Sequence, residues 1–155
     1  MLQENNTIMK PLNQNDMEKE FIPYELAVKL KALGFDEPCF VFWTNTPKYK
    51  GDNVQLCVTD GSHGHHPNSI LFKQDFLKEG EVLAPTFSQA FRWFRENHKL
   101  NFECKTPDGK AGKWFPGIHK VYGFGNMFDN DGFATHEEAE LACLSKLIEL
   151  TFKSE

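Results

Sequence analysis

The chain has 155 residues, of which 40% are hydrophobic and 14% aromatic, and this suits one globular domain with a buried core. The formal net charge of −5 gives no overall attraction for nucleic acid or anionic membranes, so binding of nucleic acid would require a local basic patch. No stretch approaches the roughly 20 apolar residues of a membrane span, and the N-terminus has no hydrophobic signal core, so we expect a cytosolic protein without membrane contact.

The beginning of the chain divides into a tail and a first helix. Residues 1–20 are rich in Asn, Gln, Glu and Met without a sustained period, and we expect a flexible tail followed by a single domain over 21–155. From Pro23 the apolar residues recur at helical spacing until Gly34, which can end a helix in a left-handed conformation. The pattern predicts a helix over 23–33.

Two β-rich runs follow this helix, at 39–44 and 53–60, and a turn region that contains Pro and Gly separates them. They predict a hairpin. Two further candidate strands, near 101–105 and 113–122, enclose the turn PDGKAG and predict a second hairpin.

Between the hairpins, the segment APTFSQAFRWFREN predicts a second helix. Thr86 and Gln89 have the spacing of a capping box. Trp93 lies at the margin of the apolar arc, so it is either a boundary residue or a stacking platform beside a groove, and we treat it as a candidate ligand-binding residue. The residues on the arc itself have the spacing of a core-facing stripe: Phe87, Ala90, Phe91 and Phe94.

A third helix is predicted from Thr135, with Glu138 closing its capping box, to the C-terminus. The order of elements is α-ββ-α-ββ-α. The fold class is α+β, with one antiparallel sheet of about four strands and helices packed mainly on one face.

The third helix is apolar on two sides. One stripe contains Ala139, Cys143, Leu147 and Leu150, and we expect it to face the core. Such a helix is either sandwiched within the fold or presents its second stripe to another chain. The candidate interface residues of that second stripe are Leu141, Leu144, Ile148 and Phe152.

The hairpin 105–122 carries a cluster of lysines next to aromatic residues. It could bind nucleic acid or a small phosphorylated ligand, or it could be the solvated outer face of a hairpin. The candidate binding residues are Lys105, Lys110, Lys113, Trp114 and Lys120.

Metal and catalytic signals are sparse. His63, His65 and His66 lie in a glycine-punctuated loop whose ligand geometry is undefined, so we expect solvent-exposed histidines and no metal or other cofactor. The cysteines form no CxxC pair and are expected to be buried thiols. His119 could act as a general base only if a carboxylate and a substrate pocket converge on it. No recognisable nucleophile motif is present, which favours a non-enzymatic protein.

The segments FIPYELAVKLKALGFDEPCF, LAPTFSQAFRWFREN and THEEAELACLSKLIEL together resemble a family of small uncharacterised proteins of Bacteroidetes phages and prophages. This resemblance implies an accessory protein of a mobile element that works in a bacterial cytoplasm. It implies no activity and no site residue. We therefore predict a binding protein that acts through contact with a protein partner or with itself, and the alternative is the ligand-binding hairpin 105–122.

Overall fold

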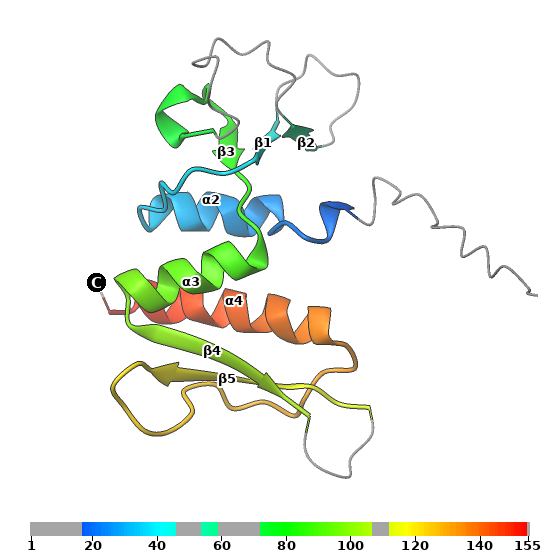
Figure 1. Cartoon of the computed structure of the whole chain (residues 1–155), viewed down its shortest axis with the longest axis vertical. Helices are drawn as coiled ribbons and strands as arrows, with labels where there is room; N and C mark the ends of the chain where they lie inside the picture. The colour runs from blue at the N-terminus through cyan, green and yellow to red at the C-terminus, as the bar shows by residue number, and fades with distance from the viewer. Residues whose placement is uncertain (1–16, 46–53, 59–71, 107–111, 155) are drawn as a thin grey trace, which may run out of the picture.

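The chain folds into three layers, with α-helices in the middle and a small antiparallel sheet on each side (Figure 1). The computed structural model describes residues 17–45, 54–58, 72–106 and 112–154. Helices α2 (Tyr24–Ala32), α3 (Phe87–Asn97) and α4 (His136–Phe152) form the middle layer. The α+β class predicted from the sequence is confirmed.

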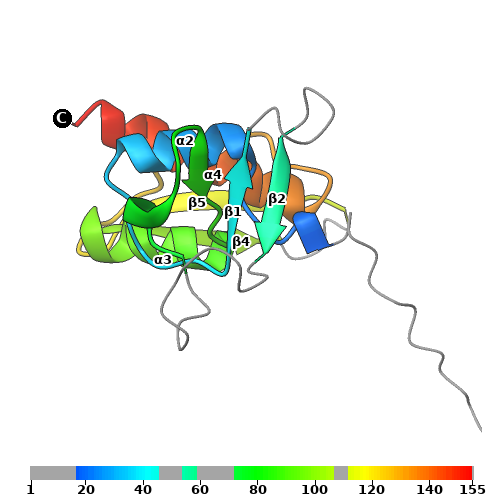
Figure 2. The same ribbon diagram turned by 90° about the horizontal axis from the view of Figure 1, so that it is seen from above.

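The outer layers are two separate sheets. One has the strand order β2-β1-β3 and contains β1 (Val41–Thr44), β2 (Gln55–Val58) and β3 (Glu81–Leu83), with a short 3-10 turn, η1 (Gln74–Phe76), before β3. The other is the hairpin of β4 (Leu100–Lys105) and β5 (Phe115–Lys120). Figure 2 shows the strands of the first sheet crossing the direction of the helices.

The prediction of a single four-stranded sheet with helices on one face differs from this arrangement. Only Lys99, with φ +57°, and the α3 C-cap His98 separate the end of α3 from β4, so the second hairpin folds back directly onto α3 and α4. The first hairpin instead pairs with β3, through Phe42 opposite Leu83 and Trp43 opposite Val82. Each hairpin thus belongs to its own layer.

Helix α4 is sandwiched, because it contacts α2 and α3 as well as both strands of the second hairpin. Two of the four predicted interface residues, Leu144 and Ile148, are therefore buried in the core of the chain itself, at 0% and 3% exposure. For these two residues the interface prediction is wrong, because other elements of the chain itself cover them. Leu141 and Phe152 remain exposed, at 39% and 44%.

The second helix buries its predicted stripe, and it also buries Trp93. Phe94 is fully buried, Phe91 is nearly so, and Phe87 is half-buried. Trp93 is only 4% exposed, and its ring packs edge-on against Phe35 at a centroid distance of 5.5 Å. Trp93 is therefore a core residue, and its prediction as a ligand-binding platform is wrong.

The helix ends follow the predicted signals closely. At α4 the capping box is complete, since the Glu138 amide donates to Thr135 Oγ1 at 3.1 Å and the Thr135 amide donates to Glu138 Oε2 at 3.3 Å. At α3 only half of the box forms, because the Gln89 side chain donates to the carbonyl of Pro38 instead of returning to Thr86. Each helix also carries a fully buried alanine four residues after its cap: Ala27, Ala90 and Ala139.

We predict that Leu144→Ala lowers the free energy of unfolding by about 2–5 kcal/mol, because it leaves a cavity in the buried core. The matched change on the same helix, Leu141→Ala, should cost less than about 1 kcal/mol because Leu141 is partly exposed. Urea unfolding followed by circular dichroism measures both values. Equal losses would contradict a sandwiched α4.

Candidate functional site

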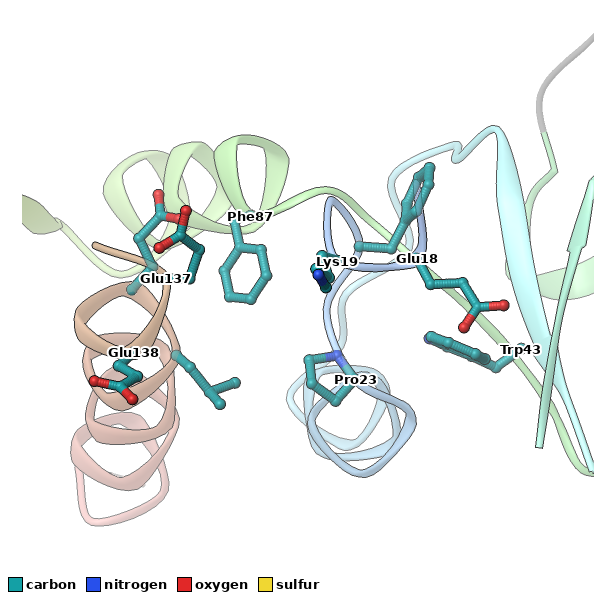
Figure 3. A pocket seen from close by; sticks show the side chains of 10 residues that line it. Glu18, Lys19, Pro23, Trp43, Phe87, Glu137 and Glu138 are labelled. Atoms are coloured by element: carbon teal, nitrogen blue, oxygen red, sulfur yellow. The ribbon is translucent and has the colours of Figure 1, made fainter. Parts of the chain in front are cut away.

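A hollow of about 430 Å³ opens where the N-terminal ends of α2 and α4 meet the first residue of α3 (Figure 3). We call it the helix-start groove. Its apolar walls come from four separate parts of the chain: Phe21, Pro23, Trp43, Phe87 and Leu141. Of the residues predicted from the sequence as an interface, only Leu141 lines it.

The groove is built on a fixed backbone. Phe21 forms a β-bridge with Thr86, and the Ile22 amide donates to the carbonyl of Pro85 at 3.0 Å, so the segment before α2 lies against the segment before α3. The Trp43 indole Nε1 donates to the carbonyl of Ile22 at 2.8 Å. This hydrogen bond fixes the indole as one wall, so the hollow exists before any ligand arrives.

The rim of the groove is acidic. Glu18, Glu137, Glu138 and Glu140 line it, and an adjoining hollow of about 450 Å³ adds Glu20. The two hollows together are lined by five glutamates and by one lysine, Lys19. An incoming positive charge is therefore favoured at this rim.

The glutamates differ in whether their carboxylates already have hydrogen-bond or charge partners within the fold. Glu138 accepts from the backbone in the capping box of α4. Burial raises the pKa of Glu140 above its ordinary value, and the neighbouring Glu137 and Glu20 raise it further, whereas His136 at 3.5 Å opposes the shift. The crowding of carboxylates at Glu140 means that a cation bound there relieves repulsion.

The structure separates Lys120 from Lys105 among the predicted basic residues of the second hairpin. Lys105 pairs with Glu103 at 2.9 Å, and Lys113 donates to the carbonyl of Asp131 at 3.0 Å. Lys120 lies at the opposite end of the hairpin from Lys105, since the two pair with Leu100 and Phe115 respectively. Lys110 lies outside the described residues.

Trp114, the aromatic member of that predicted group, is half-buried in packing within the chain. Its backbone bridges to Phe133, and its ring packs edge-on against the ring of His136 at a centroid distance of 4.8 Å.

A histidine–carboxylate pair that the sequence did not disclose lies on this hairpin. His119 Nε2 is 2.6 Å from Glu103 Oε1, and His119 Nδ1 is 3.1 Å from the carbonyl oxygen of Gly125. Which ring nitrogen donates depends on the tautomer of His119. A Cβ at Gly117 would approach His119 Nε2 to 2.9 Å, so the pair needs a glycine there.

This geometry ties a loop to the hairpin and leaves neither ring nitrogen open to a substrate. A general base needs a nitrogen within reach of the proton that it removes. We therefore interpret the pair of His119 and Glu103 as structural.

The four cysteines are free thiols, and none of those with a resolved pKa shift is activated. Burial raises the pKa of Cys39 to about 12 and also raises the pKa values of Cys143 and Cys104. A raised pKa disfavours the reactive thiolate.

Within the described ranges, no group of three or more His, Cys, Asp or Glu side chains could hold a metal ion. The candidate ligands His63, His65 and His66 lie outside those ranges. In the same part of the chain, no helix has the length and apolar character needed to cross a membrane. No family model matches this chain, and no curated protein or solved structure matches it either.

We predict that the Glu103 carboxyl titrates below the ordinary glutamate pKa and that Lys105→Gln moves it upward, because the hydrogen bond from Lys105 is the largest cause of the lowered pKa. The carboxyl carbon signal in NMR, followed through the acid range, measures this pKa. Lys113→Gln is the control, since Lys113 bonds elsewhere, and it should leave the midpoint unchanged.

The sign of the linked stability follows from the same shift. The folded pKa of Glu103 is lower than the unfolded one, so the pairing stabilises the fold above the unfolded pKa and this contribution is lost as pH falls through the folded pKa. If Lys105→Gln left the Glu103 midpoint in place, our assignment of the cause would be wrong.

Proposed function

We propose that this chain is a non-enzymatic binding protein that holds a segment of a protein partner in the helix-start groove. The observation that carries the proposal is a preformed apolar hollow with an acidic rim. Its volume of about 430 Å³ falls within the range of roughly 300–1,000 Å³ that is typical of ligand pockets. The occupant that fits is a segment in which an aromatic or aliphatic side chain stands next to lysine or arginine.

The two halves of this chemistry come from different residues. The walls offer Trp43, Phe87 and Leu141 for the apolar side chain, whose burial supplies affinity. The glutamates at the rim offer the charges that select a basic segment and reject an acidic one.

Binding of nucleic acid or a phosphorylated ligand through the hairpin 105–122 has less support. Lys105 and Lys113 already bond to oxygen atoms of the chain itself, and Lys120 lies away from them. An acidic groove also repels phosphate.

The biological setting that we propose is that of a phage or prophage accessory protein in a bacterial cytoplasm. This setting rests on the resemblance of the three sequence segments. The four free thiols agree with a reducing compartment, where disulfides are rare.

We predict that a short peptide alternating lysine with leucine and phenylalanine binds the groove, whereas the same peptide with glutamate in place of lysine does not. In a titration followed by ¹H–¹⁵N NMR, the indole N–H of Trp43 and the amides of 137–141 should shift. Added salt should weaken binding because the charges lie at an exposed rim.

The matched variants are Leu141→Gln and Phe152→Gln. Both replace a partly exposed apolar residue of α4, but only Leu141 lines the groove. Leu141→Gln should lower the affinity of the groove for the basic peptide at least tenfold, and Phe152→Gln should leave this affinity unchanged. Equal binding of both peptides, or equal loss in both variants, would contradict the proposal.

A further inference from the structure

The loop that follows β5 exposes two aromatic side chains completely. We call residues 121–127, with the sequence VYGFGNM, the GFG loop. Tyr122 is 92% exposed and Phe124 is 108% exposed, the two highest values among the large hydrophobic side chains that the structure describes. Val121 and Met127 are also exposed, so the loop is an apolar projection.

Hydrogen bonds hold this projection in one shape. The Met127 amide donates to the carbonyl of Ile118 at 2.7 Å, and the Asn126 side-chain oxygen accepts from the amide of Ile118 at 2.9 Å. His119, paired with Glu103, bonds to the carbonyl of Gly125, whose φ of +98° suits glycine. The aromatic side chains are therefore presented by an ordered backbone, which lowers the entropy cost of binding.

The GFG loop and the helix-start groove lie at opposite ends of the molecule. The Val121 amide donates to the carbonyl of Lys99, just after the C-terminal end of α3, whereas Phe87, the first residue of α3, lines the groove. The 11 residues of α3 separate these two points by about 16 Å. In Figure 1 the loop after β5 lies at the far end from the start of α4. A loop tied to β5 at this distance leaves the groove of its own chain empty.

The loop carries the chemistry that the groove selects. Its own residues are uncharged, but the exposed lysines Lys99 and Lys120 stand beside its first residue, and Asp129 follows its end. Lys99 Nζ donates to the carbonyl of Glu96, whereas Lys120 places an exposed positive charge at the start of the loop that bears Phe124. The groove offers apolar walls inside a rim of glutamates.

We infer that the occupant of the groove is the GFG loop of a second copy of this chain. This inference rests on the proposed function of the groove and names its partner. Phe124 enters between Trp43, Phe87 and Leu141, and Lys120 approaches the glutamates of the rim. Complementary charge and an aromatic anchor in an apolar pocket are the features that concentrate binding energy at interfaces.

The symmetry of this contact has a measurable consequence. A loop at one end and a groove at the other give a heterologous, head-to-tail contact, which adds further copies until a ring closes. Two copies joined in this way still offer one free loop and one free groove. The oligomer should therefore grow beyond a dimer as the protein concentration rises.

The test is sedimentation velocity at a series of concentrations with the whole chain and two variants. We expect the mass of the wild-type oligomer to pass two copies, and Phe124→Ser or Leu141→Gln alone to remove this growth. An equimolar mixture of the two variants keeps one intact loop and one intact groove, so it should form a one-to-one dimer and nothing larger. Phe40→Ser, which removes an exposed aromatic ring elsewhere, should associate as the wild type does.

Four outcomes would overturn the inference: a wild type that stays monomeric up to its solubility limit, growth that stops at two copies, unchanged growth with Phe124→Ser, or a variant mixture without dimers. Each is distinct from failure of the groove itself. If the lysine-containing peptide still binds at Trp43 and 137–141, the proposed function stands with a different partner. If neither the peptide nor a second copy binds, both proposals are wrong.

Discussion

The rest of the structure depends on the burial of α4 from two sides. Ala139, Cys143, Leu144 and Ile148 are all nearly inaccessible, and at 3.6 residues per turn they span about half of the helix circumference. A helix of this kind requires cover on each side, and the second hairpin, with α2 and α3, supplies it. The division of five short strands into two sheets follows from this requirement, because each sheet then has helices to cover one of its faces.

The helix layer of α2, α3 and α4 also determines where a groove can form. The first turns of all three helices carry a small buried residue, Ala27, Ala90 or Ala139. The acidic rim has a partly structural origin, because glutamates in the first turn of α4 satisfy backbone amides and oppose the positive end of the helix dipole. The apolar walls have no such origin. The helix starts would form equally well if the side chains of Phe21, Pro23 and Phe87 were covered. The open hollow between these side chains therefore agrees with the proposed binding of a ligand.

Local signals in the sequence were sufficient for the helices, their caps and both hairpins, and insufficient for β3, the division into two sheets and the site. Thr135, Glu138 and Gly34 act within a few residues, so their roles could be predicted. The burial of Trp93 could not be predicted, because Phe35, which lies more than fifty residues earlier in the chain, covers the margin of the apolar arc on which Trp93 lies. The groove collects residues from four segments, and β3 has only three residues, so neither has a periodic signal. The pair of His119 and Glu103 depends on the register of β4 against β5, which sequence alone left open.

The exposed aromatic side chains of the GFG loop are hard to explain as ordinary surface. A loop free to rearrange can turn its aromatic residues against the protein and bury about 150–250 Å² of each. Here the backbone bonds of Ile118 and the contact of His119 with Gly125 oppose this rearrangement. The chain thus orders polar groups in order to hold an apolar group in water, which costs free energy in the isolated molecule. That cost is recovered only where another surface covers Phe124, and an apolar groove within an acidic rim is the complementary surface that this chain itself provides.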